Sequence, residues 1–151
     1  MHPTIALAKS DEHLDFIAKH FEETIALWED YQVTPESVQK RKDQLQEWAT
    51  DKNAHLTVAI APGHQVIGFN SLYITKDYSG NALGKIVILY VLPEHRGTGI
   101  AAVLKRDGKS WLRFKGVNKV ITEIDAKNER MLEINMKAGF RIKSYTFEKE
   151  I

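Results

Sequence analysis

The first fifty residues carry apolar side chains at the spacing of two amphipathic helices. A short apolar segment at residues 4–8 predicts a strand. Apolar residues then recur every three or four positions, at Leu14, Ile17, Phe21, Ile25 and Trp28. This spacing predicts a helix capped by Ser10 or Asp11. Thr34-Pro35-Glu36 supplies a capping side chain, a proline for the first turn and an acid near the positive helix end, which together predict a second helix.

Between residues 56 and 92 the pattern is typical of strands. Residues 56–61 and 66–74 are rich in β-forming side chains and flank Pro62-Gly63-His64, a turn sequence, so they predict an antiparallel hairpin. Residues 85–92 (KIVILYVL) show no polar alternation. A strand of this kind is covered on both faces, so we expect it in the middle of the sheet.

The last third alternates helix and strand. Apolar residues from Ile100 to Leu112 lie on one helical stripe that also contains Gly108, and the glycine predicts a close approach of this helix to the sheet. Residues 117–125 predict a strand. Asn128 caps a fourth helix that Gly139 ends in left-handed conformation, and residues 140–148 predict a final strand. The whole order predicts one mixed α/β domain over residues 1–151.

Composition narrows the class of protein. The 21 basic and 20 acidic side chains nearly cancel, so no overall field attracts nucleic acid or an anionic membrane. The basic run Lys40-Arg41-Lys42 is typical of a solvated helix face. The sequence has no cysteine, no signal-peptide pattern and no apolar run of the roughly 20 residues that span a bilayer. We therefore expect a soluble cytoplasmic protein.

Arg96-Gly97-Thr98-Gly99 lies between the apolar strand and the third helix. Two glycines let the backbone turn several N–H groups toward one point, where the helix dipole also favours an anion. A plain tight turn would use the same residues. The segment is not a nucleoside-triphosphate loop, because that motif needs a lysine and a Ser/Thr at positions where this sequence has neither.

Two segments together resemble a known family. VLPEHRGTGIAAVL is similar to motif A of the GCN5-related N-acetyltransferase (GNAT) family, with Arg96, Gly99 and Ala101 at the motif positions. Residues 128–140, an asparagine, a helix and a closing Gly-Phe, resemble motif B. The resemblance implies an α/β fold with a mixed, mostly antiparallel sheet of six to seven strands, four helices and a β-bulge beside the coenzyme slot. It also implies transfer of an acetyl group from acetyl-CoA to a primary amine of a small molecule, peptide or protein.

The resemblance further implies how acetyl-CoA, the co-substrate, would be held without any metal. The backbone of Leu89, Tyr90 and Val91 would pair with the pantetheine arm. Asn128 would contact the coenzyme near its pantetheine or thioester end, although a simple helix cap accounts for this residue equally well. The residues at the pyrophosphate would be Arg96, Gly97, Thr98, Gly99, Ile100, Ala101 and Ala102.

Three residues are candidates for the chemistry. An amine must lose a proton before it attacks, and the similarity to enzymes that acetylate ribosomal-protein N-termini makes Glu123 the candidate base. An exposed strand carboxylate is the alternative interpretation. Many members protonate the departing thiolate with a tyrosine of motif B, but this chain has Asn135 there, and an amide has no titratable proton near neutrality. Tyr90 is a candidate replacement, although a core position explains it more simply.

The departure at Asn135 motivates a second hypothesis, a non-catalytic acyl-CoA-binding module that senses or regulates. The acceptor pocket is expected around Glu29, Asp30 and Tyr31 and beside the final strands, and the two acids hint at a cationic acceptor. The partners are therefore acetyl-CoA and an amine, with a homodimer left open.

Overall fold

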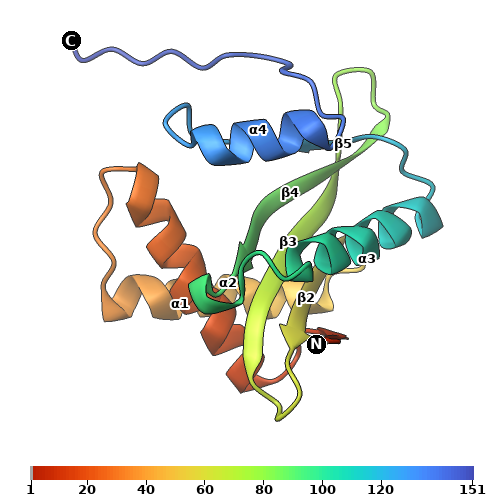
Figure 1. Ribbon diagram of the computed structural model, residues 1–151. Helices are drawn as coiled ribbons and strands as arrows, with labels where there is room; N and C mark the ends of the chain where they lie inside the picture. Colours follow the sequence, from red (N-terminus) through yellow and green to blue (C-terminus); the bar gives the residue numbers. More distant parts are fainter. Residues whose placement is uncertain (1) are drawn as a thin grey trace.

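Five strands form one sheet in the order β1-β2-β3-β4-β5 in the computed structural model, which describes residues 2–151 (Figure 1). The strands are β1 (Thr4–Leu7), β2 (Ala54–Ile60), β3 (Val66–Lys76), β4 (Ala82–Val91) and β5 (Val120–Thr122). The helices are α1 (Asp11–Trp28), α2 (Pro35–Thr50), α3 (Ile100–Phe114) and α4 (Glu129–Lys137), with a short 3₁₀ helix η1 (Pro93–His95). Neighbouring strands are antiparallel except β4 and β5, which run parallel. The mixed α/β fold is thus confirmed.

The helices begin where the sequence placed their caps. The Ser10 hydroxyl accepts from the His13 N–H at 3.2 Å. At α2, Thr34 and Ser37 exchange two hydrogen bonds between side chain and backbone, 2.9 and 3.0 Å long, which form a capping box. These side chains satisfy backbone groups that a helix end otherwise leaves unpaired.

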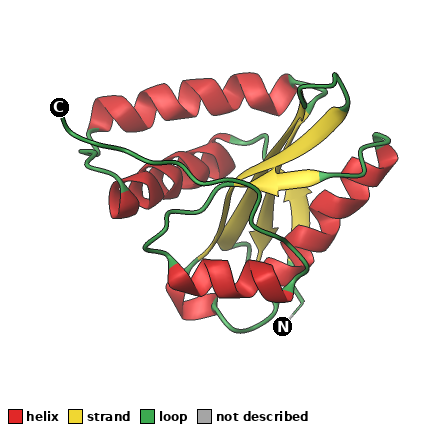
Figure 2. Cartoon of the chain, turned by 90° about the horizontal axis from the view of Figure 1, so that it is seen from above, coloured by secondary structure: helices red, strands yellow, loops and turns green. Residues whose placement is uncertain are grey.

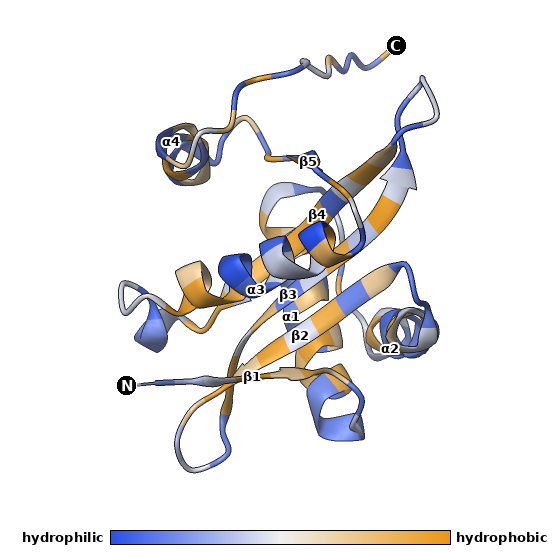
Figure 3. Ribbon diagram, turned by 90° about the vertical axis from the view of Figure 1, so that its right-hand side faces the viewer, coloured by the Kyte–Doolittle hydropathy of each residue, from blue (hydrophilic) through white to orange (hydrophobic). Residues whose placement is uncertain are grey.

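Helices cover both faces of the sheet (Figure 2). One face packs against α1 and α2 through a cluster that includes Ile17, Leu45 and Phe69. The other face packs against α3 through a cluster that includes Ile67 and Leu104. The strands are accordingly the most apolar part of the ribbon in Figure 3, while polar residues lie on the outer helix surfaces.

Gly108 explains how closely α3 approaches the sheet. A Cβ atom added there would lie 3.0 Å from Asn70 Nδ2 and 3.2 Å from Leu72 Cδ2, both on β3. Because real Cβ atoms seldom have neighbours that close, a larger residue would require the Asn70 and Leu72 side chains to shift by a few tenths of an ångström. The predicted close approach is confirmed.

Three expectations about the sheet need correction. The sheet has five strands rather than six to seven, because residues 140–151 form no strand and their side chains are almost all exposed. The fourth helix is followed by extended chain near the end of the molecule that carries β5 (Figures 1 and 3). The strand expected at residues 117–125 is shortened to β5. The middle strand is β3, not β4, although apolar clusters cover both faces of β4 as expected.

None of the helices within residues 2–151 combines the length and the apolar character needed to cross a bilayer.

A candidate active site at the open edge of β4

The two parallel strands pair over only a short stretch. The β4–β5 ladder joins Gly84 to Val120, Lys85 to Ile121 and Ile86 to Thr122, and ends there. From Val87 to Val91, β4 has a strand neighbour on the β3 side only. The second half of β4 therefore presents an open edge, as expected for a slot between diverging strands.

A β-bulge at Val87 decides which backbone groups face that edge. Ser71 pairs with Ile88 and Leu72 pairs with Ile86, so Val87 is the extra residue. Before the bulge, the Ile86 C=O faces β5, where it accepts from the Thr122 hydroxyl at 3.2 Å. Without an extra residue, Ile88 would face the same way, because backbone groups alternate along a strand.

After the bulge, the even-numbered residues of β4 turn their backbone groups toward β3 instead of β5. The N–H and C=O of Ile88 face β3, where both bond the Ser71 hydroxyl, and the Leu92 N–H donates to Ile67 C=O at 2.8 Å on the same side. By alternation Tyr90 also faces β3, and the backbone groups of Leu89 and Val91 face the open edge. Two of the three residues predicted to contact pantetheine thus present polar groups outward.

The glycine loop follows directly and is tied to the same edge. Arg96 Nε donates to the Val91 C=O at 2.9 Å, which holds the start of the loop against the end of β4. Gly97 and Gly99 have φ of 77° and 87°, in the left-handed region that favours glycine. Thr98 is exposed, and its hydroxyl donates to the His95 C=O at 2.6 Å.

Gly99 is the N-cap of α3, and it has no side chain with which to cap the helix. The N–H groups of the first turn, at Ile100, Ala101 and Ala102, are therefore left for another acceptor. A Cβ added at Gly97 or Gly99 would meet no atom within 4 Å, so open space lies over both glycines. An uncapped helix N-terminus under open space is suited to an anion such as pyrophosphate.

Tyr90 turns its side chain away from the open edge, toward α1. Its ring stacks on His20 at 4.7 Å and on Phe69 at 5.7 Å between centroids, and the Arg96 guanidinium lies 5.6 Å away. Burial raises the pKa of the Tyr90 phenol, which keeps its proton at neutral pH. Burial also lowers the pKa of His20, against an opposing effect of Glu23. The Tyr90 side chain therefore belongs to the aromatic core beneath α1.

The two other catalytic candidates lie on separate elements. Glu123 follows β5 and pairs with Lys85 of β4 at 3.1 Å, with the Glu123 side chain 80% exposed. The hydrogen bond to Glu123 raises the pKa of Lys85. Asn135 of α4 is 6% exposed. Its C=O accepts from the N–H of Phe140 at 2.9 Å. Asn128 caps α4 through its side-chain oxygen, which accepts from the Met131 N–H at 3.2 Å.

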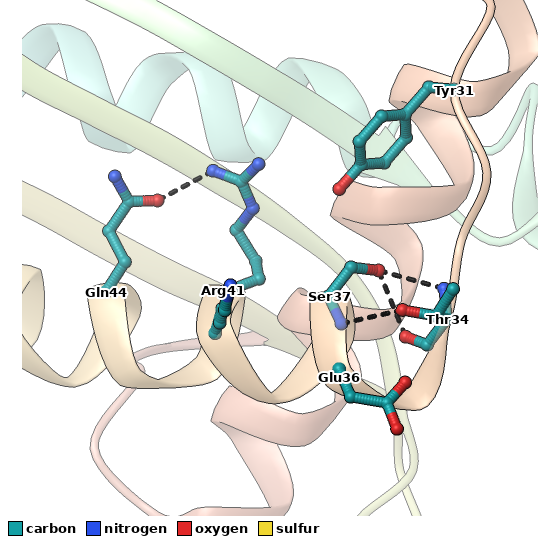
Figure 4. Close-up of a pocket in the computed structure, with 7 residues that line it drawn as sticks. Tyr31, Thr34, Glu36, Ser37, Arg41 and Gln44 are labelled. Carbon is teal, nitrogen blue, oxygen red and sulfur yellow. Dashed lines mark hydrogen bonds between the residues drawn. The ribbon is translucent and has the colours of Figure 1, made fainter.

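A cavity of about 500 Å³ lies where the α1–α2 connection meets α2 (Figure 4). It is lined by Tyr31, Thr34, Glu36, Ser37, Lys40, Arg41 and Gln44. Of the three residues expected at an acceptor pocket, only Tyr31 is among them. Arg41 and Gln44 point the same way from α2 and share a 2.6 Å hydrogen bond, as Figure 4 shows.

Beneath this cavity lies a buried carboxylate that the sequence analysis missed. Glu22 is fully buried and binds the Tyr31 hydroxyl at 2.6 Å and Arg41 at 3.1 Å. Burial alone would raise the pKa of Glu22, but hydrogen bonds from Tyr31, Ser37 and Arg41 lower it below its usual value. A signal was present in the sequence, since Glu22 directly follows Phe21 on the apolar side of its helix.

Comparisons with known proteins agree with this arrangement. The sequence model described as the acetyltransferase (GNAT) family matches residues 21–140. The chain therefore belongs to the GNAT family of acetyltransferases. A mycothiol acetyltransferase of Arthrobacter sp. (strain FB24) is 27% identical over 88 residues, which are 58% of this chain and 27% of that protein. The chain thus spans about a quarter of the length of the curated relatives it matches.

Solved structures share the fold at low identity. A putative acetyl transferase from Pyrococcus furiosus superposes with a TM-score of 0.81 at 20% identity, covering 99% of this chain and all (100%) of that one. A transcriptional regulator from Bacillus halodurans gives 0.81 at 18% identity with the same coverage. These two similarities establish the fold alone.

Proposed function

We propose that the chain is an acetyl-CoA-dependent N-acetyltransferase that acetylates a primary amine of a small molecule, peptide or protein. The Leu89 groups and the Val91 N–H face out from β4, while the Val91 C=O accepts from Arg96 Nε of the glycine loop. The observation that carries the proposal is this open edge of β4, which the glycine loop connects to the uncapped first turn of α3. An extended amide-bearing arm joined to a pyrophosphate has the right chemistry to lie along it.

The residues have distinct parts in this proposal. Leu89 and Val91 orient the pantetheine arm, while residues 96–102 hold the pyrophosphate. Transfer forms an N–C bond at the acetyl carbon and breaks the C–S bond, so the amine must give up a proton and the thiolate must gain one. Glu123 is the proposed proton acceptor, and it forms an ion pair with Lys85 of β4. Asn135 donates a hydrogen bond near the sulfur rather than a proton.

A second function, a non-catalytic acyl-CoA-binding module, is favoured by one observation. Many family members have a tyrosine that acts as the general acid at the position of Asn135. The Tyr90 phenol, the candidate replacement, lies in the aromatic core. Both functions require the coenzyme, so binding alone does not separate them.

The test measures free thiol released from acetyl-CoA in the presence of amines. The panel includes small polyamines, amino sugars, amino acids and peptides with free N-termini. Catalysis predicts thiol release that saturates with at least one amine and an acetylated product of mass 42 Da above the acceptor. Coenzyme binding without thiol release in the presence of any amine of the panel would favour the binding module. Failure to bind coenzyme would refute both.

A further inference from the structure

We propose that Ser71 is a positioning residue that locks the β4 bulge and so directs the backbone of Leu89 and Val91 into the coenzyme slot. This inference rests on the proposed function for its consequence, but the lock itself is a feature of the fold. Ser71 lies on β3 and has no solvent exposure. No motif of the sequence pointed to it.

The Ser71 hydroxyl bonds the same residue that Ser71 faces in the strand ladder. Its oxygen accepts from the Ile88 N–H at 2.9 Å, and its proton is donated to the Ile88 C=O, also at 2.9 Å. One hydroxyl can do both, since it has one donor and two acceptor sites. Both backbone groups of the residue after the bulge are thus held by a single side chain.

Ile88 is the residue at which the backbone groups of β4 change from facing β5 to facing β3. The C=O of Ile86 faces β5, whereas both groups of Ile88 face β3. The reversal requires the Ile88 groups to have partners on the β3 side, because buried backbone N–H and C=O groups are seldom left unpaired. Ser71 also pairs with Ile88 in the strand ladder, and its hydroxyl adds two hydrogen bonds that favour this direction over the unreversed one.

The position of Ser71 means that its effect on the coenzyme is indirect. Ser71 lies on the sheet face toward α1 and α2, away from the slot, so it does not touch the coenzyme. Its effect on binding must therefore pass through Ile88 to the next residue, Leu89, whose backbone groups face the open edge.

The matched control is Thr57, another buried hydroxyl in the same sheet. Thr57 lies on β2, is 2% exposed, and its hydroxyl is buried without a hydrogen-bond partner. Thr57→Val removes a buried hydroxyl of the same kind while leaving β4 untouched. Ser71→Ala removes the lock, and Ser71→Cys keeps a group of similar size that hydrogen-bonds weakly.

Two measurements are made on each variant: CoA affinity by calorimetry, and amide hydrogen exchange at Ile88 and Leu89 by NMR. Ser71→Ala should weaken CoA binding about three- to tenfold, since the loss of one or two hydrogen bonds to backbone groups has an effect of that order. Exchange at Ile88 should accelerate more than at other β4 amides. The CoA affinity and the Ile88 exchange rate of Ser71→Cys should fall between those of wild type and Ser71→Ala. Ser71→Cys takes the place of Ser71→Ala in both measurements if Ser71→Ala does not fold.

Affinity within twofold of wild type in a folded Ser71 variant, or an equal loss in Thr57→Val, would overturn the proposal. Unchanged exchange at Ile88 would do the same. If the wild-type chain does not bind CoA, the proposed function fails while the exchange experiment still decides whether Ser71 locks the bulge.

Discussion

Glu123 is a surface carboxylate that pairs with the ammonium group of Lys85, and this pairing makes its proposed role testable. As a general base it should contribute about 10²–10⁴-fold to turnover. Glu123→Gln should therefore lower kcat at neutral pH at least a hundredfold and leave the KM for acetyl-CoA nearly unchanged. Steady-state kinetics with a saturating acceptor give both values.

Lys85→Met is the matched control, because it breaks the same ion pair and keeps the carboxylate. The base hypothesis predicts a small effect on kcat in this variant. Equal losses in Glu123→Gln and Lys85→Met would mean that the ion pair matters rather than the base.

Asn135 is nearly buried on α4, and its proposed hydrogen bond to the sulfur predicts a modest effect. Asn135→Ala should lose about 0.5–1.5 kcal/mol, which slows kcat about two- to tenfold. Asn135→Tyr restores the usual residue of the family and should retain or raise activity if the slot has room for the phenol. Measuring kcat and both KM values checks this prediction.

An opposite pattern is informative. A rise in the acceptor KM of Asn135→Tyr, with coenzyme affinity unchanged, would place Asn135 at the acceptor instead. A thousandfold loss of kcat in Asn135→Ala would contradict a purely orienting role.

Single residues with local roles were predictable. The caps at Ser10, Thr34 and Asn128 follow from side chains that reach their own helix within three residues. The buried pairing of Glu22 with Arg41 was missed because the partners are 19 positions apart on different helices. Ser71 was missed for a similar reason, since its partner Ile88 is 17 positions away.

At the scale of elements, the uncapped N-terminus of α3 predicts a specific loss of binding. Gly99→Val should weaken CoA affinity at least tenfold while the chain stays folded, because a β-branched side chain disfavours the left-handed backbone and fills the open space above the helix end. Calorimetric titration with CoA measures the change.

Gly80→Val is the matched control for backbone strain. Gly80 also has a left-handed φ, 83°, and open space around it, but it lies in the turn between β3 and β4. Both variants should lose similar stability in thermal unfolding, and only Gly99→Val should lose affinity. Equal affinity of Gly99→Val and wild type would remove the loop from the proposed site.

Elements that depend on distant partners were predicted less well than helices. Residues 140–148 have strand-forming residues, but a strand exists only where an edge accepts it, and β5 is three residues long. In the structure this segment is not part of the sheet, and Phe147 is 91% exposed. The apolar run of β4 predicted cover on both faces correctly. Its place in the sheet order depends on pairing, which an apolar pattern does not encode.

At the scale of the whole molecule, the proposed site joins two parts of the fold that bind different ends of one ligand. The edge of β4 would hold the pantetheine arm, and the N-terminus of α3 would hold the pyrophosphate. A ligand that binds only the folded state raises its stability by about 2.7 kcal/mol at a concentration of 100 Kd. For a chain of this size each kcal/mol corresponds to about 2–4 °C in Tm, so saturating CoA should raise Tm by about 5–10 °C.

Fragments of the coenzyme then separate the two parts. Pantetheine and ADP at the same concentration should each raise Tm less than CoA does, because each contacts only one part and the covalent link supplies the second at high effective concentration. In Gly99→Val the shift caused by ADP should disappear and that caused by pantetheine should remain. In Ser71→Ala the shift caused by pantetheine should shrink and that caused by ADP should remain, since the bulge orients the β4 edge and not the loop. Differential scanning fluorimetry on wild type and both variants gives all nine shifts. If the Tm shifts caused by the two fragments fall equally in both variants, the edge of β4 and the N-terminus of α3 do not act as separate halves of one site.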